Sequence, residues 1–361
     1  MAKDILSVKA LYTQQRLLFM TLDPVHIGAG GYRLGRVDMT IAREPGTNLP
    51  KIPGTSLAGA ARNYASMRYG KPDVAGQHKN FKGDRTTCPI IYTFGTATDT
   101  GSGPTQSGGV NQAGTVSIGD AHILFFPVSS MAGPVWVSTM DRVQETWGEE
   151  SVKLPQNIEP TDDLVVTNLS CDKELNLGWL MFNATKDLVV TPIEEVKARP
   201  EWTAIKGRIV LVTSKLFSQI VNSNLEVRTS VSISPETGAA EQGALFTYEA
   251  IPRATWLWCD VVENDYRTNG DGTSKFLPTD KQCKFEKITV QKDGKDEEQK
   301  LYHDNAGEPL GEIWKRPLDV VNAGMRLIEY LGVGGMGTRG FGRMRSVAHW
   351  DVSNGGVNEK P

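Results

Sequence analysis

Glycine-rich loops lie near both ends of the chain, and each is bordered by one strand signal and one helix signal. Residues 16–27 mix apolar with β-favouring side chains, which predicts a strand, and a glycine loop at 28–35 follows. Near the other end, a predicted helix at 317–330 leads into the glycine run at 332–342 and a predicted strand at 343–350. Strand and helix signals mixed in this way favour an α+β fold over a doubly wound parallel sheet.

The first glycine loop is followed by a short extended segment at 37–42, turn signals at 45–53 and a helix pattern that ends at Gly70. The alanines and arginines of this pattern are good helix formers. We expect Thr55 or Ser56 to cap its first turn, because a side-chain oxygen at that position can accept a hydrogen bond from a free backbone N–H.

The middle of the chain is rich in strand signals. Residues 115–128 form the clearest one, residues 135–147 predict a strand that passes into a short helix, and further apolar or β-branched patterns lie at 209–220 and 254–262. The segment 225–252 alternates on both sides of a Pro-Glu-Thr-Gly turn, which predicts a long β-hairpin.

The length of 361 residues allows one large domain or two. We expect one domain, residues 1–361, that carries two insertions. The first, at 71–114, is rich in turn residues, ends in a low-complexity run and is expected to be flexible. The second, at 263–311, is dominated by charged residues, Gly and Asn, and is expected to be a solvated surface insertion.

Composition excludes several classes of protein. The 39% hydrophobic content is too high for a disordered chain, and no apolar run reaches the roughly 18 residues that a membrane span needs. The N-terminus lacks the apolar block and cleavage site of a secretory signal, so we expect a cytoplasmic protein without a membrane partner. The cysteines form no C-x-x-C pair and are expected to be free thiols; they are Cys88, Cys171, Cys259 and Cys283.

The net charge of −3 hides two basic stretches. Residues 28–71 contain seven basic against two acidic side chains, and residues 312–345 contain six against three, so the remainder of the chain carries a net charge of −11. Both stretches include a glycine loop. Together they can form one anion-binding face on an acidic body, although solvated surface charge explains the same pattern.

The glycine run at 332–342, followed by Arg343 and Arg345, has the composition of a phosphate-binding loop, because glycine lets backbone N–H groups approach a polyanion. It matches neither a P-loop nor a dinucleotide fingerprint, so an ATP or NAD site is unsupported.

A helix, a glycine-rich loop and a strand near the C-terminus resemble the arrangement found in the RAMP superfamily of CRISPR systems. The opening motifs HIGAG, GRVDMTIARE and KIPGTSLAGAAR resemble backbone subunits of type III effector complexes. TVSIGDAHILFFPV and VRTSVSISPETGAAEQGALFTYEAIP are similar to the repeated backbone subunit of the type III-B Cmr complex.

This resemblance implies a ferredoxin-like core of the RNA-recognition-motif type, which binds CRISPR RNA and single-stranded target RNA. It implies a filament of several copies together with other type III effector subunits. The segment 226–249 would be a thumb hairpin that splays a base pair at every sixth position, and Asp38 would cut the target RNA there. Subtypes III-A and III-D also remain open, as do a non-catalytic scaffold subunit and an endonuclease that processes CRISPR precursor RNA.

Asp38 lies in a loop with Arg36 and Arg43. A carboxylate there can hold a hydrated divalent cation, Mg²⁺ being the expected ion, or can assist deprotonation of a 2′-hydroxyl while an arginine stabilises charge on the phosphate. Without the resemblance, a surface ion pair is the simpler interpretation of this aspartate.

Other residues are candidates for RNA contact because they are basic, aromatic, hydroxyl-bearing or glycine residues in the resembling motifs. They are His26, Arg33, Arg36, Arg43, Lys51, Ser56, Arg62, Arg228, Thr229, Phe246, Gly337, Arg339 and Gly340. Each has a structural alternative. His26 can pack at a strand end, Ser56 can simply cap its helix, the charged side chains can be solvated, and Phe246 with Tyr248 can be core residues of the hairpin.

Some RAMP proteins carry zinc ligands in the region that matches residues 78–94. Here His78 and Cys88 remain, but Tyr92 stands near the expected place of a second cysteine. Two ligands do not complete a tetrahedral site, so we expect no structural zinc.

Overall fold

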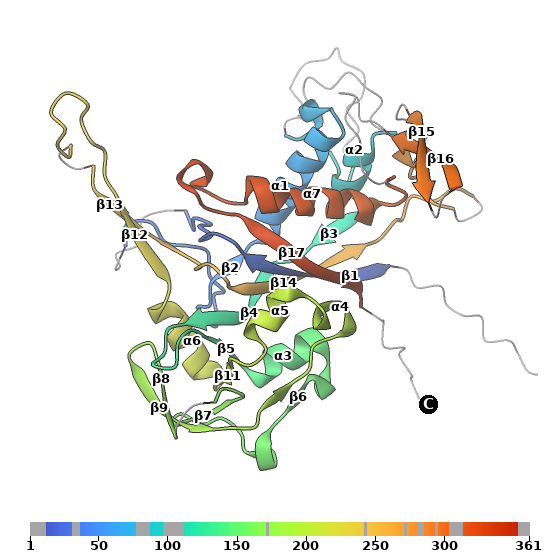
Figure 1. The fold of residues 1–361 in the computed structure, drawn as a ribbon. Coiled ribbons are helices and arrows are strands. Elements are labelled where there is room, and N and C mark those ends of the chain that lie inside the picture. The colour runs from blue at the N-terminus through green and yellow to red at the C-terminus, as the bar shows by residue number, and fades with distance from the viewer. Residues whose placement is uncertain are drawn as a thin grey trace, which may run out of the picture.

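A computed structural model describes residues 12–30, 37–76, 87–96, 112–170, 173–241, 244–270, 273–279, 285–292, 295–302 and 313–352. Its centre is a mixed sheet with the strand order β17-β1-β14-β4-β5-β11-β7-β9-β8, to which β2 and β3 add at β4 and β14 (Figure 1). The protein is therefore α+β, with antiparallel and parallel pairs in one sheet.

The strands of this sheet are β1 (Thr13–Thr21), β2 (Lys51–Ile52), β3 (Val116–Ile118), β4 (Ala121–Val128), β5 (Val135–Ser138), β7 (Leu164–Thr167), β8 (Glu174–Leu177), β9 (Leu180–Thr185), β11 (Ile209–Leu211), β14 (Trp256–Glu263) and β17 (Met344–Asp351). Three two-stranded pairs stand apart: β6 (Val152–Lys153) with β10 (Val189–Val190), β12 (Glu226–Ser230) with β13 (Phe246–Ala250), and β15 (Phe285–Lys292) with β16 (Lys295–Tyr302). The helices are α1 (Gly54–Arg68), α2 (Pro89–Phe94), α3 (Met140–Trp147), α4 (Glu194–Lys197), α5 (Pro200–Ile205), α6 (Ser214–Ser223) and α7 (Pro317–Leu331).

Helices cover both faces of the central strands, with α1 and α7 on one side and α3, α4 and α5 on the other (Figure 1). This explains why the first strand signal alternates only partly. Leu17 and Phe19 of β1 pack in the cluster on the α1 and α7 side, whereas Leu18 between them packs in the cluster on the α3 and α5 side. Both faces are covered in the middle of β1, from Gln15 to Phe19, so both accept apolar side chains there.

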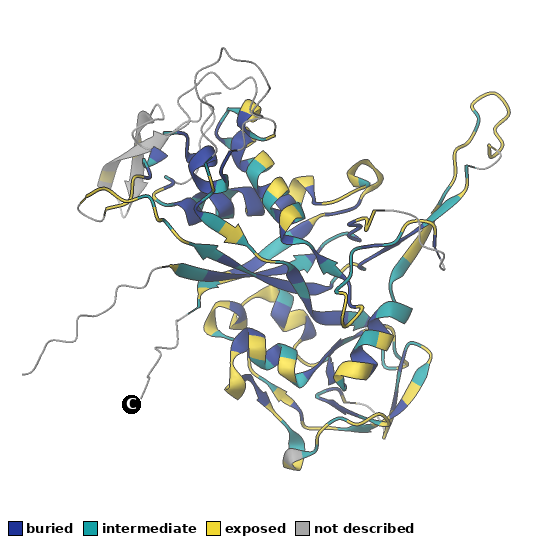
Figure 2. Ribbon diagram, turned by 180° about the vertical axis from the view of Figure 1, so that it is seen from behind, coloured by how far each residue is buried: buried dark blue, intermediate teal, exposed yellow. Residues whose placement is uncertain are grey.

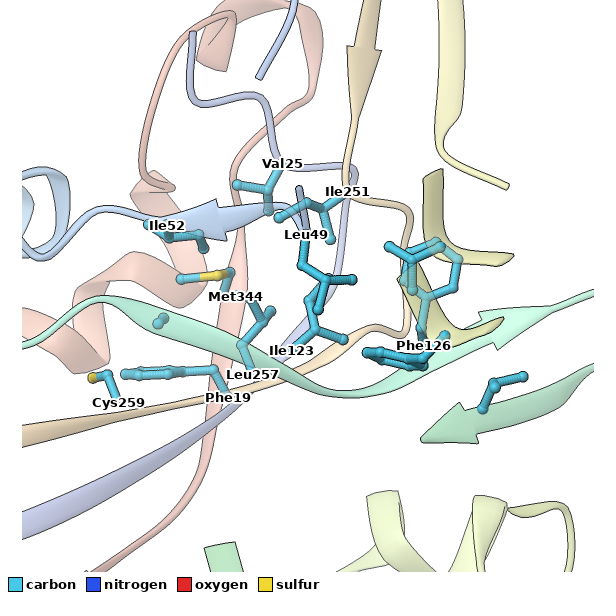
Figure 3. Close-up of a cluster of buried hydrophobic side chains, with 14 of the residues drawn as sticks. Phe19, Val25, Leu49, Ile52, Ile123, Phe126, Ile251, Leu257, Cys259 and Met344 are labelled. Carbon is cyan, nitrogen blue, oxygen red and sulfur yellow. The ribbon is translucent and has the colours of Figure 1, made fainter. Parts of the chain in front are cut away.

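The cluster beneath α1 and α7 joins residues from both ends of the chain. Phe19, Ile52, Ile123, Leu257 and Met344 are all buried there (Figure 3). The two helices approach closely because Gly324 of α7 has no side chain: a Cβ at this position would lie 2.1 Å from the backbone oxygen of Ala61 in α1. The opposite cluster is built on aromatic rings, with the Trp147 and Trp202 centroids 5.3 Å apart and edge to face.

The hairpin β12–β13 extends away from the sheet (Figure 1), and its distal residues are exposed (Figure 2). Beyond the paired strands, Ile233 forms an isolated bridge with Ala240 around the Pro-Glu-Thr-Gly turn. The hairpin base contacts the remainder of the molecule on two sides, as described below.

Two details differ from the expectations drawn from the sequence. Helix α1 begins at Gly54 with Pro53 as its N-cap, so no side chain caps it and neither Thr55 nor Ser56 has that role. The segment 209–220 contains the short strand β11 and then helix α6, whose N-cap Thr213 accepts a hydrogen bond from the Leu216 N–H.

The two insertions are described in part. Within 71–114, helix α2 buries Ile90, Ile91 and Tyr92, whereas the low-complexity run lies largely outside the described residues. Within 263–311, Phe276 is buried and meets the Tyr92 ring edge to face at 5.4 Å, so this insertion contributes to a hydrophobic cluster besides carrying the strands β15 and β16.

Cys88 and Cys259 are free and buried, and Cys171 and Cys283 lie outside the described residues. Within the described part of the chain, no helix combines the length and the apolar character that a membrane span requires.

Candidate functional site

Strand β13 lies between β12 and the extended segment at 37–41. Met39 forms a parallel bridge with Tyr248: the Met39 N–H donates to the Thr247 oxygen at 3.0 Å, and the Glu249 N–H donates to the Met39 oxygen at 3.2 Å. The chain after the first glycine loop thus runs as a third strand along the hairpin base. Because side chains alternate along a strand, Phe246 and Tyr248 share one face of β13, and Thr247 and Glu249 share the other.

Asp38 is exposed at the start of this third strand. Its Oδ2 accepts hydrogen bonds from the Thr247 backbone N–H at 2.7 Å and from the Thr247 hydroxyl at 2.9 Å. These bonds, the backbone one first, lower the pKa of Asp38 below its ordinary value, because they stabilise the ionised form. The site therefore presents a charged carboxylate at neutral pH.

Glu249 is 8% exposed and holds the same segment. Its Oε1 accepts from the Ile41 N–H at 3.0 Å and from Arg43 Nη2 at 2.8 Å. The Arg43 guanidinium is thereby paired beneath the loop, and its Nη1 is buried without a hydrogen-bond partner within the described residues. This geometry favours a positioning role for Arg43 over direct contact with a phosphate.

His26 is 3% exposed and lies behind the first loop. Its Nδ1 is 2.7 Å from the Glu249 backbone oxygen, which can only accept, so Nδ1 carries the proton. The C-terminal glycine loop passes over this residue: the Gly335 N–H donates to the His26 oxygen at 2.9 Å. Gly334 has a φ of +88°, and a Cβ there would lie 2.5 Å from the same oxygen. Only glycine fits this contact without strain.

The Phe246 and Tyr248 face of β13 packs against the same glycine loop. The Arg339 guanidinium lies 5.1 Å from the Phe246 ring centroid, and the Arg228 guanidinium lies 4.8 Å from that of Phe341. Phe341 also meets Tyr248 edge to face at 5.4 Å. Arg228 and Arg339 are exposed, so two cations stand over aromatic rings at the hairpin base.

A groove of about 370 Å³ separates α1 from the glycine loop. Small and polar side chains line it on the α1 side, and backbone lines it on the loop side: Thr55, Ser56, Gly59, Ala60, Asn63, Tyr64, Leu331, Gly332, Val333, Gly334, Gly337 and Phe341. The Tyr64 hydroxyl donates to the Gly332 oxygen at 2.6 Å, which joins the two walls at one end. The first loop, the hairpin base, the glycine loop and this groove thus adjoin one another.

A family model for the RAMP superfamily matches residues 18–345. This chain belongs to the RAMP superfamily. Within it, the chain is most like the repeated backbone subunit of type III-B Cmr complexes. It is 30% identical over 258 residues to the CRISPR system Cmr endoribonuclease Cmr4 of Pyrococcus furiosus, a match that covers 67% of this chain and 79% of that protein.

Solved structures share the fold of this RAMP chain. Oligomeric Cmr4 from Pyrococcus furiosus aligns with a TM-score of 0.51 at 19% identity, over 95% of this chain and 99% of the other. A chain of the type III-B Cmr-beta complex in its apo state aligns with a TM-score of 0.54 at 12% identity, over 95% and 98%.

The remaining predicted residues of the RAMP chain divide into three groups. Ser56 lines the groove, Gly337 and Gly340 are exposed in the glycine loop, and Thr229 is exposed on β12 opposite Thr247. Lys51 and Arg62 are held elsewhere: the Lys51 ammonium pairs with Asp120 at 2.5 Å, and the Arg62 Nε donates to the Val74 oxygen at 3.0 Å. Arg33 and Arg36 lie outside the described residues.

The donor set at Asp38 bears on the expected Mg²⁺. Across the described ranges, no three His, Cys, Asp or Glu side chains gather as a metal site. Asp38 Oδ2 is occupied by Thr247, and Oδ1 accepts no hydrogen bond from any described residue. One carboxylate oxygen without a donor among the described residues is too little for a site built by protein alone, but it matches the share that proteins supply when Mg²⁺ also binds water and a substrate phosphate. As for zinc, Cys88 is buried in a hydrophobic cluster, and His78 lies outside the described residues.

The sequence analysis did not single out Thr247, Glu249 or Phe341. On the returning hairpin strand it selected the aromatic residues Phe246 and Tyr248. The partners of Thr247 and Glu249 are Asp38 and the Ile41 N–H, more than 200 positions away along the chain. No local pattern carries that pairing.

Proposed function

We propose that this RAMP chain is the backbone subunit of a type III CRISPR ribonucleoprotein, and that it binds CRISPR RNA and cleaves complementary target RNA at six-nucleotide intervals with Asp38. The observation that supports this most is the position of Asp38: a charged, exposed carboxylate held against the hairpin base by Thr247, just after the first glycine loop. The related Pyrococcus furiosus protein is named an endoribonuclease, which supports the same chemistry.

The hairpin β12–β13, within the predicted thumb at 226–249, is the proposed wedge. Val231, Ile233 and Leu245 are exposed on its distal part. Apolar side chains on a narrow hairpin can enter between bases, where stacking stabilises them. Arg228 and Arg339 at its base would contact the RNA backbone, since both are exposed cations next to a loop of glycines.

In the proposed reaction, the wedge turns one nucleotide out of the helical stack and aligns its 2′-oxygen with the adjacent phosphorus. The Asp38 carboxylate would take the proton of the 2′-hydroxyl as that oxygen forms a bond to phosphorus. The bond from phosphorus to the 5′-oxygen of the next nucleotide would break, and that oxygen would take a proton from water, which leaves a 2′,3′-cyclic phosphate on the upstream fragment. In the alternative, Asp38 Oδ1 would hold a hydrated Mg²⁺, which would supply neutralisation of charge on the phosphate.

We also propose that the core is ferredoxin-like. The strand order β17-β1-β14-β4, in antiparallel pairs, supports this. Helix α1 follows β1 in the chain, α7 follows β14, and the two helices pack against each other on one face. This is the strand order of two split βαβ units. Filament formation by copies of this chain, Mg²⁺ dependence and a cytoplasmic location remain predictions.

The test is replacement of Asp38 in the effector complex assembled with its CRISPR RNA. We expect Asp38→Ala to leave assembly and target binding unchanged and to abolish the regular cleavage ladder, a loss of at least about a hundredfold in rate. Asp162→Ala is the matched control, because Asp162 is also exposed but pairs with Lys215. An undiminished ladder from Asp38→Ala would assign the chain to the scaffold alternative, with another subunit cutting.

A further inference from the structure

Among the described residues, Thr247 alone donates hydrogen bonds to the Asp38 side chain, and it donates two. Within the described ranges, the Thr247 backbone N–H and the Thr247 hydroxyl are the donors to Asp38 Oδ2. The Asp38 backbone N–H in turn donates to the Thr247 hydroxyl oxygen at 3.1 Å. The hydroxyl therefore contacts Asp38 at two atoms, once as a donor and once as an acceptor.

These contacts decide which carboxylate oxygen is available. An exposed aspartate ordinarily samples several rotamers. With Oδ2 held by two donors, this carboxylate is restrained, and Oδ1 is the oxygen left for an RNA hydroxyl or a hydrated cation.

Thr247 is itself held by the hairpin. It pairs with Thr229 across β12–β13, and its backbone oxygen accepts the Met39 N–H at 3.0 Å on the other side. Its neighbours Phe246 and Tyr248 contact Arg339 and Phe341 of the glycine loop. Thr247, which holds Asp38, is thus part of the same hairpin that is proposed to distort the RNA.

We infer that Thr247 is the positioning residue for Asp38: its hydroxyl orients the cutting carboxylate and couples that orientation to the base of the hairpin. This inference rests on the proposed function of Asp38. It adds that the hydrogen bond from Thr247, and not the first loop alone, fixes where the Asp38 carboxylate lies relative to the hairpin, and so which RNA linkage it reaches.

The experiment isolates the hydroxyl, because the backbone N–H bond does not depend on the side chain. Thr247→Val keeps the β-branched shape that suits a strand but removes the hydroxyl. Thr247→Ser keeps the hydroxyl. Thr47→Val is the matched control, because the Thr47 hydroxyl also donates to an acid, Glu44, at 2.5 Å on an exposed turn away from Asp38. Each variant is assembled with CRISPR RNA, and single-turnover cleavage and target binding are measured across pH.

We expect Thr247→Val to cleave about tenfold more slowly with unchanged target affinity, because misplacement of a reacting group lowers the rate more than the binding. Thr247→Ser should cleave within about twofold of the wild type, as should Thr47→Val. Thr247→Val should also move the acidic limb of the rate profile to higher pH, since loss of a donor makes the carboxylate easier to protonate. A purely structural role for Thr247 would not move this limb.

Equal rates for Thr247→Val and the wild type, or a serine variant as slow as the valine variant, would overturn the inference. If Asp38→Ala still cleaves, the proposed function fails first; if it is inactive while Thr247→Val cleaves normally, only the positioning role fails. Should Thr247→Val not bind target, Thr247→Ala supplies the same comparison, with the same expected loss and the same serine control.

Discussion

Glu44 and Glu263 are both partly buried glutamates, and their surroundings act on them in opposite directions. Burial raises the pKa of Glu44, but the hydrogen bonds from Thr47 and His122 together with the nearby charge of Arg142 outweigh it, and the net pKa lies below the ordinary value. For Glu263, burial dominates and raises the pKa, with only partial opposition from Arg316. Glu263 Oε2 is buried without a partner among the described residues. At neutral pH, Glu44 therefore stabilises the fold in its charged form, and Glu263 destabilises it.

This difference predicts that Glu263→Gln is more stable than the wild type at pH 7. A carboxyl whose pKa is raised by folding contributes stability that is present below its unfolded pKa and is lost as pH rises through the folded value. The extra free energy of unfolding of the glutamine variant should therefore become smaller as pH falls toward about 4. Urea unfolding of the isolated wild-type and variant chains at pH 7 and at about pH 4 measures this difference.

Glu44→Gln is the opposite control for that experiment. The depressed pKa of Glu44 means that its contribution is present above the unfolded value and is lost as pH falls through the folded one. This variant should have a lower free energy of unfolding than the wild type at pH 7. The difference between the two should become smaller as the pH falls. A Glu263→Gln variant that is less stable than the wild type at pH 7 would show that Glu263 is satisfied in the folded protein.

At the scale of elements, the pairing of α1 with α7 places the glycine loop. Tyr64 of α1 bonds the Gly332 oxygen at the C-terminal end of α7, so the two helices and the loop after them are fixed together. Gly324 permits the close contact with Ala61. A Cβ added at Gly59, two residues before Ala61 in α1, would meet no atom within 4 Å.

These two helical glycines should respond in opposite ways to alanine. Gly324→Ala places a methyl group 2.1 Å from a backbone oxygen, and we expect it to destabilise the protein by about 1–3 kcal/mol, as overpacking does. Gly59→Ala should stabilise it by about 0.5–1 kcal/mol through helix propensity alone. Thermal and urea unfolding report both. Stability changes of the same sign in the two variants would contradict the close packing of α1 on α7.

At the scale of the whole molecule, the distribution of charge matters more than its sum. The chain has a net charge of −3, yet Arg228 and Arg339 stand exposed on one face at the hairpin base. Lys51 and Arg43 from the basic N-terminal stretch are paired with Asp120 and Glu249, and the exposed Arg228 is paired with Glu226 at 2.6 Å. Arg43 and Lys51 are therefore less available to RNA than composition indicates.

Single-stranded RNA binding by the isolated chain should weaken as salt rises. We expect the combined variant Arg228→Ala with Arg339→Ala to reduce the slope of log affinity against log salt by about 1.4, since each phosphate contact on a single strand contributes about 0.7. Lys197→Ala with Arg199→Ala removes two cations at α4 and α5 and should leave the slope unchanged. Binding titrations between about 50 and 200 mM salt measure this. Equal slopes in the two double variants would remove Arg228 and Arg339 from the RNA interface.

Much of the fold was predictable because its signals are local. The predicted helix at 317–330 corresponds to α7, the strand at 343–350 to β17, and the pattern at 135–147 to β5 and α3. The clearest strand signal, at 115–128, divides into β3 and β4 on either side of Gly119 and Asp120. Asp120 lies between the two strands, where its carboxylate accepts hydrogen bonds from Lys51 and from the Gly54 N–H. Both partners are more than 60 residues away along the chain, so the local pattern does not predict this break.

The sequence by itself determined which segments become strands, helices and glycine loops, because periodicity, turn chemistry and glycine content act within a few residues. It also indicated Asp38, through motifs that resemble the RAMP family. Only the tertiary structure decided what surrounds that acid: Thr247 as its partner, Arg43 paired beneath the loop, and His26 buried against Glu249. These contacts join residues more than 200 positions apart, and their energies depend on where sheet pairing brings the chain, which no local pattern encodes.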